Sequence, residues 1–130
     1  MKINSVDNII SKASDCFDDS KEFLAKERYE AALNRSYYSM FHCIQALLST
    51  VKFVTKSHSG AHNAFHKEFI LTQLFSKDLG LALKRTFEKR QFGDYEYDEV
   101  FYEDAKESVE DAQKFLNATT QYLKENNFLK

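Results

Sequence analysis

One stretch decides the fold: Tyr29-Glu-Ala-Ala-Leu-Asn-Arg-Ser-Tyr-Tyr-Ser-Met-Phe-His-Cys-Ile-Gln-Ala-Leu-Leu48. Read as a helix at about 100° per residue, it places apolar side chains along one side, three and four positions apart. These apolar residues are Leu33, Tyr37, Met40, Ile44, Leu47 and Val51. The other side carries Ala31, Arg35, Ser39, His42 and Ala46, with Tyr38 at its edge. Because Arg35 and His42 are about two turns apart, their side chains point the same way, and we predict a second face that the core does not use.

The remaining sequence predicts four more helices around this one. Apolar residues at helical spacing give helices over residues 5–26, 28–51, 60–73, 77–92 and 99–125. Ser5 is suited to cap the first. The chain has no proline and three glycines, so little interrupts long helices. Because the first two helices are joined by a short connection, we predict an antiparallel hairpin within an all-α, five-helix bundle, and one domain over residues 1–130.

Composition excludes several classes of protein. A hydrophobic fraction of 43% in 130 residues is enough for a core and excludes a disordered chain. The formal net charge of −2 argues against a general nucleic-acid coat protein, whose affinity would come from neutralising phosphates. No apolar run approaches the ~18 residues of a membrane span. Cys16 and Cys43 lack the spacing of metal ligands and indicate reduced thiols, so we expect a cytoplasmic protein without a membrane segment.

Charge is distributed unevenly in the second half of the chain. A basic run lies in the fourth predicted helix, made of Lys84, Arg85, Lys89 and Arg90, and acidic residues dominate from Asp94 to Asp111. Two interpretations stay open. The two faces pair within or between chains, or they form a groove for phosphate and a face for a basic partner. Arg90 and Asp94 are also spaced to pair at the end of their helix.

Three histidines follow one another at intervals of four: His58, His62 and His66. Two histidines at this spacing on a helix are able to bind a metal ion. No Asp, Glu or Cys joins them at a matching spacing, and His58 precedes the predicted helix. We therefore expect no metal site and no cofactor.

The segment Asn34-Arg35-Ser36-Tyr37-Tyr38-Ser39-Met40-Phe41-His42 resembles the signature of HEPN domains (higher eukaryotes and prokaryotes nucleotide-binding), an Arg followed by four to six residues and a His. The resemblance continues through Lys56-Ser-His-Ser-Gly60 and Arg90-Gln-Phe-Gly-Asp-Tyr95, and it covers nearly the whole chain. These segments are similar, in order and spacing, to the small prokaryotic single-domain branch of the family.

This resemblance implies a metal-independent ribonuclease of a toxin–antitoxin or defence system. Arg35 and His42 would be the catalytic pair, brought together with a second pair at the interface of a homodimer. Asn34, Tyr38, Lys56 and His58 would contact RNA or a nucleotide, and a nucleotidyltransferase-type antitoxin would be the protein partner. The alternative is a non-catalytic HEPN dimer that binds a nucleotide or a partner. For Tyr38, stacking on a base, hydrogen bonding to a phosphate and packing at a subunit interface all stay open.

Overall fold

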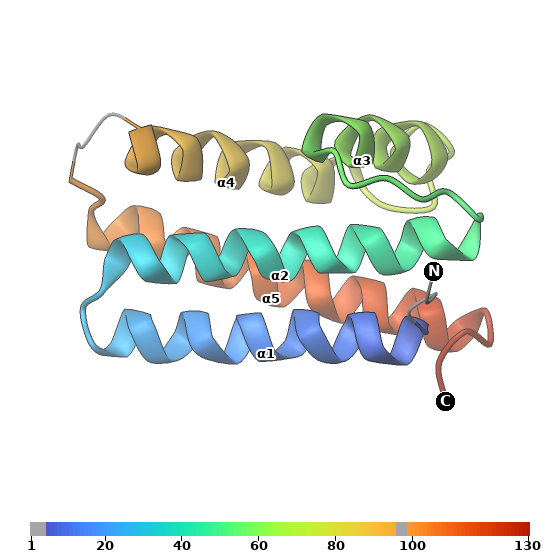
Figure 1. Ribbon diagram of the computed structural model, residues 1–130, viewed down its shortest axis with the longest axis horizontal. Coiled ribbons are helices and arrows are strands. Elements are labelled where there is room, and N and C mark those ends of the chain that lie inside the picture. Colours follow the sequence, from blue (N-terminus) through green and yellow to red (C-terminus); the bar gives the residue numbers. More distant parts are fainter. Residues whose placement is uncertain (1–4, 96–98) are drawn as a thin grey trace.

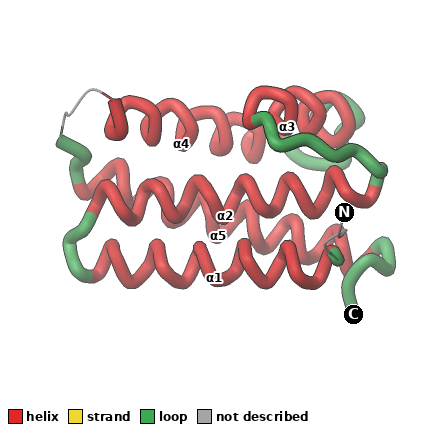
Figure 2. The backbone as a smooth tube through the Cα atoms, in the orientation of Figure 1, coloured by secondary structure: helices red, strands yellow, loops and turns green. Residues whose placement is uncertain are grey.

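The computed structural model describes residues 5–95 and 99–130, and within them the chain forms helices and no strand (Figures 1 and 2). Side chains of residues 92–95 lie outside this description. The helices are α1 (Val6–Ala25), α2 (Tyr29–Thr50), α3 (His58–Phe65), α4 (Lys77–Tyr95) and α5 (Tyr102–Glu125), and a π-helical segment, His66–Ile70, continues α3. The predicted all-α, five-helix bundle is confirmed. No described helix is both long and apolar enough to cross a membrane.

The bundle is built on the antiparallel hairpin of α1 and α2, which lie side by side in Figure 1. Ser5 caps α1 as predicted, and its side chain accepts a hydrogen bond from the Asn8 backbone N–H at 3.1 Å. The chain then reverses at Glu27, whose φ of 61° is left-handed. α5 packs against α2, α1 and α4, while α4 and α3 lie on the side of α2 away from α1.

The apolar side of α2 forms the centre of the core. Its predicted members from Leu33 to Leu47 are all at most 1% exposed. Val51 is the exception at 46%, because α2 ends at Thr50 and Val51 begins the loop. α5 supplies Phe115, whose ring is tilted against the rings of Phe65 and Phe75. Phe69 joins this group of rings, which lies where α3, its π-helical continuation and α5 meet.

The second face of α2 is less open than the sequence predicts. Ser39 and Ala46 are fully buried. The Ser39 hydroxyl donates a hydrogen bond to the Ala13 carbonyl oxygen of α1 at 2.8 Å. The small side chains therefore serve the close approach of α1 and α2 within one chain. They do not form part of an open surface between two chains, whereas Arg35 and His42 remain half-buried.

Several helix boundaries differ from the prediction. α5 begins at Tyr102 and not at residue 99, and the predicted third helix ends with the π-helical segment at Ile70 and not at residue 73. α3 begins at His58, two residues earlier, because Ser57 caps it by accepting a hydrogen bond from the Gly60 backbone N–H at 3.1 Å. α4 continues through Gly93 to Tyr95.

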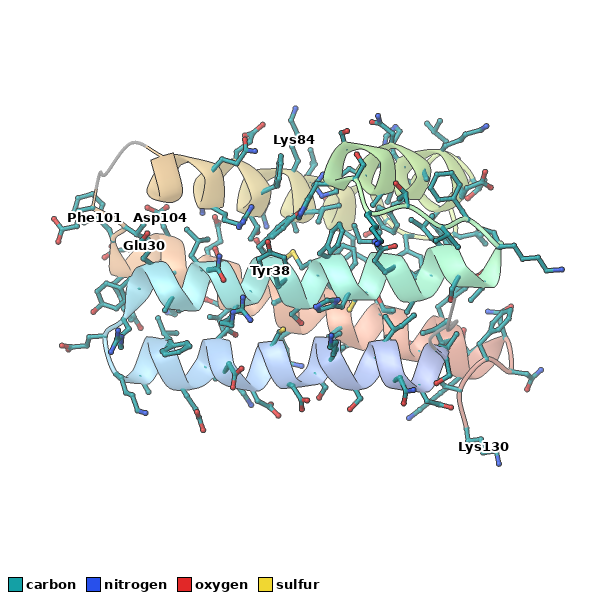
Figure 3. All side chains as sticks on the ribbon, in the orientation of Figure 1. Glu30, Tyr38, Lys84, Phe101, Asp104 and Lys130 are labelled. Atoms are coloured by element: carbon teal, nitrogen blue, oxygen red, sulfur yellow. The ribbon has the colours of Figure 1, made fainter. Side chains whose placement is uncertain are left out.

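The basic residues of α4 pair with acidic residues of α5 inside the chain. Arg85 donates to both carboxylate oxygens of Asp111, at 2.8 and 2.7 Å. Lys89 contacts Glu107 and lies 3.4 Å from Asp104. Lys84, labelled in Figure 3, points away from the bundle. The interpretation that the basic and acidic faces pair within the chain therefore holds for Arg85 and Lys89.

Candidate functional site

Tyr38 lies at the centre of a polar group on α2, on the side toward α4 (Figure 3). Two guanidinium groups lie over its ring, with the Cζ atoms of Arg35 and Arg90 5.2 and 5.0 Å from the ring centroid. Arg90 Nη2 also donates a hydrogen bond to the Tyr38 hydroxyl oxygen at 3.1 Å. One half-buried ring thus joins a cation of α2 to a cation of α4.

Arg35 is held in place by its neighbour in the sequence. The Asn34 side-chain oxygen accepts from Arg35 Nε at 3.2 Å and from Nη2 at 2.7 Å. Arg35 Nη1 lies 4.0 Å from the sulfur of Cys16 on α1. A guanidinium has five N–H donors, and these contacts use three of them, so two N–H groups remain for an anion. Asn34, expected to contact RNA, has its side-chain oxygen committed to positioning Arg35.

His42 lies one turn beyond Tyr38, with the two ring centroids 6.3 Å apart. Burial lowers the pKa of its imidazole, and the nearby positive charges of Lys12 and Arg35 lower that pKa further. The imidazole is therefore neutral near pH 7 and able to accept a proton. Both Arg35 and His42 lie on the predicted side of α2.

Lys12 and Cys16 of α1 were not predicted to take part in this group. The antiparallel hairpin predicted from the sequence could have indicated them. In an antiparallel pair of helices, residues about equally far from the turn face one another. Counting outward from Glu27 in both directions brings Lys12 to the level of His42, and Cys16 to the level of Tyr38, less than one turn from Arg35.

A second polar cluster joins α2 to α3. The Tyr37 hydroxyl lies 2.6 Å from His58 Nδ1 and 2.9 Å from His62 Nε2. Because the phenol has one hydrogen, it donates to one imidazole and accepts from the other. Burial and neighbouring His58 lower the pKa of His62 to about 4. Burial and Arg90 lower the pKa of His58, and burial raises that of Tyr37.

The histidine spacing therefore places His58 and His62 on one side of α3, where they bind a phenol. Tyr37 belongs to the core, as predicted, and its hydroxyl also anchors α3. Within residues 5–95 and 99–130, no three His, Cys, Asp or Glu side chains are grouped so that they could hold a metal ion.

Of the other two residues expected to contact RNA, His58 lies next to the polar group on α2 and Lys56 does not. His58 stacks on Phe41 with centroids 4.4 Å apart and meets the Tyr38 ring edge-on at 6.1 Å, so it adjoins the group on α2. Lys56 is exposed in the loop before α3, and no described contact joins it to Arg35 or His42. The sequence predicted Asp94 as the partner of Arg90, but the side chain of Asp94 lies outside the described residues. The structure instead shows Arg90 in contact with Tyr38, 52 positions away in the sequence, and no sequence pattern indicates this contact.

Comparison with known proteins agrees with the family resemblance found in the sequence. Residues 6–123 match the model of the HEPN domain. The chain is 37% identical over 115 residues to a "UPF0332 protein" of Thermotoga maritima, covering 88% of this chain and 87% of that protein. It is 36% identical over 126 residues to "Putative toxin MJ0142" of Methanocaldococcus jannaschii, covering 96% and 86%. A second protein of that organism, "Putative toxin MJ0605", is 26% identical over 117 residues, covering 90% and 87%.

Proposed function

The chain belongs to the HEPN domain family, and from this premise we propose that it is a metal-independent ribonuclease of a toxin–antitoxin or defence system. The observation that carries the proposal is the pairing on α2 of a held guanidinium, Arg35, with a neutral imidazole, His42. These are the two kinds of group that cleavage of RNA by its own 2′-hydroxyl needs, a cation for the phosphate and a proton acceptor for the hydroxyl.

The reaction follows from these roles. His42 takes the proton of the 2′-hydroxyl, whose oxygen then forms a bond to phosphorus while the bond from phosphorus to the 5′-oxygen breaks. The leaving 5′-oxygen takes a proton from an acid, and the products are a 2′,3′-cyclic phosphate and a 5′-hydroxyl. Arg35 stabilises the charge that builds on the phosphate oxygens through the remaining N–H groups of its guanidinium. Neither water nor a metal ion enters this step.

We place the second acid–base group in a second copy of the chain. One chain supplies one His42, and a two-fold dimer through the half-buried Arg35 and His42 side would supply the other. We infer this interface from the chemistry of Arg35 and His42 and not from the small side chains of the same face, since Ser39 and Ala46 are buried inside the chain. His58, beside Tyr38, and the exposed Lys56 would contact RNA outside the cleaved bond.

The names of two relatives support a cellular setting for this proposal. Both proteins carry the name "Putative toxin". We propose a toxin of the cytoplasm, controlled by a nucleotidyltransferase-type antitoxin.

The test is cleavage of RNA by the purified protein in EDTA. Wild type should leave a 2′,3′-cyclic phosphate and should not cut DNA, which lacks the attacking hydroxyl. His42→Ala should lose roughly 10²–10⁴-fold in rate, the usual contribution of general acid–base assistance. Arg35→Lys should also fail, because lysine keeps the charge but loses the planar fork.

His66→Ala is the matched control, since His66 is exposed on the π-helical segment. It should cut RNA like wild type. Thermal melts must show that the variants are folded. Equal cleavage by wild type and both folded site variants would refute the catalytic assignment. A wild type that binds nucleotide but never cuts RNA would establish the alternative, a binding module.

A further inference from the structure

We propose that the Tyr38 hydroxyl donates a hydrogen bond to a non-bridging oxygen of the substrate phosphate, and that Arg90 is the residue that positions this hydroxyl. The inference rests on the proposed function, because it assigns a ligand chemistry to the same site. It decides among the roles that the sequence leaves open for Tyr38, and it gives Arg90 a part in the site.

The direction of the hydroxyl hydrogen follows from the contact with Arg90. Arg90 Nη2 donates into the phenol oxygen at 3.1 Å, so it occupies the acceptor side of that oxygen. Among the described residues, Tyr38 has no other hydrogen-bond partner. Because Tyr38 is half-buried and its hydroxyl hydrogen has no acceptor among the described residues, we infer that this hydrogen is available to a ligand.

The ring itself is already used. Arg35 and Arg90 lie over it, and the rings of Tyr37, Phe41, His42 and His58 surround it with centroids 5.4 to 6.3 Å away. A nucleobase that stacked on Tyr38 would have to displace a cation or one of these rings. The hydroxyl is therefore the part of Tyr38 that is free to act.

The surroundings select an anion as the acceptor. Both guanidinium groups lie within 5.2 Å of the ring centroid, and Arg35 has two N–H groups that its described contacts do not use. A phosphate held there by Arg35 would present a second oxygen to the phenol. The hydrogen bond from Arg90 polarises the phenol and strengthens it as a donor.

The first experiment uses Tyr38→Phe, which keeps the ring and its cation contacts and removes the hydroxyl. A hydrogen bond to a charged group contributes enough that cleavage should slow by about 10- to 100-fold. RNA with one phosphate oxygen replaced by sulfur, a poorer acceptor, gives a second measurement. Wild type should cut one of the two phosphorothioate isomers more slowly, and Tyr38→Phe should lose this discrimination. Tyr122→Phe, on α5, is the matched control and should behave as wild type.

Arg90→Gln separates positioning from a direct effect of charge. If Arg90 acts through Tyr38, the substitution slows cleavage in the wild-type background and adds little in Tyr38→Phe. An equal loss in both backgrounds would overturn the positioning role.

Binding to RNA with a single 2′-deoxy residue at the cleavage site, measured by fluorescence anisotropy, tests the contact without cleavage. Tyr38→Phe should bind this RNA about tenfold more weakly. If wild type never cuts but this loss is seen, the ribonuclease proposal fails and the Tyr38 contact stands. If Tyr38→Phe binds and cuts as wild type does, the contact is wrong while the ribonuclease stands. A wild type that neither binds nor cuts overturns both.

Discussion

Lowering the pH should destabilise the folded protein through His62. The pKa of this side chain is lowered to about 4 in the folded state, against 6.5 ordinarily, because the ring is largely buried and lies beside His58. The unfolded state therefore binds a proton between these two values and the folded state does not. The contribution of His62 to the free energy of unfolding is complete above pH 6.5. It falls as the pH drops toward 4 and does not change further below that pH.

The size of the loss in stability follows from the difference between the pKa values of His62 in the unfolded and folded states. One pH unit is worth about 1.4 kcal/mol for one proton. At pH 5, roughly 1.5 units below the ordinary pKa, the loss is at most about 2 kcal/mol. Because the ring is partly exposed, solvent screening reduces this, and we expect about 1 to 1.5 kcal/mol from His62. The pKa values of His42 and His58 are lowered too and act in the same direction.

The assay is urea unfolding followed by circular dichroism at pH 7 and pH 5. His62→Gln removes the titrating ring, so the free energy of unfolding of this variant should fall by about 1 kcal/mol less than that of wild type between the two pH values. His66→Gln, changed at an exposed position, should show the full wild-type loss. If His62→Gln and wild type lose the same free energy, His62 is not kept neutral by its surroundings and the reasoning is wrong.

Three further predictions concern the packing. Arg85→Met should lower the free energy of unfolding in urea by about 2 kcal/mol, because it leaves the buried Asp111 carboxylate without its bidentate partner. Adding Asp111→Asn to the same chain should recover part of this loss. If Arg85→Met causes no loss, the pair does not contribute to stability. Ser39→Leu should cost about 1 to 3 kcal/mol by forcing α1 away from α2, and a stable variant with altered self-association would instead place Ser39 at an interface between chains. Burial raises the pKa of the Cys43 thiol to about 12, so a thiol reagent should label it after unfolding in urea and not before; rapid labelling of the native protein would contradict its full burial.

The sequence predicted what depends on neighbours along one helix. Ser5 as a cap, the apolar side of α2 and the shared direction of Arg35 and His42 all follow from spacing within a few turns. The helical order of the bundle follows in the same way. The earlier start of α3 was also within reach, because Ser57 precedes Gly60 at the spacing of a cap.

The sequence did not predict which side chains meet across elements. Spacing showed that Ser39 shares a side of α2 with Arg35, but it did not show that α1 covers Ser39. The bonds from Tyr37 to His58 and His62, and from Arg90 to Tyr38, join positions 21, 25 and 52 residues apart. Such pairs depend on how whole helices pack, which periodicity within one helix does not determine.

The position of α5 in the bundle has a consequence for synthesis of the protein. α1 and α2 are neighbours in sequence, so the hairpin is able to form early from local contacts. α5 is made after the other four helices, yet it supplies Phe115, Ala112 and Leu123 to the core against which α2 rests. While the chain is still on the ribosome, the apolar side of α2 lacks this cover. Arg35 and His42 therefore lie on a helix whose apolar side is fully covered only after α5 has been added.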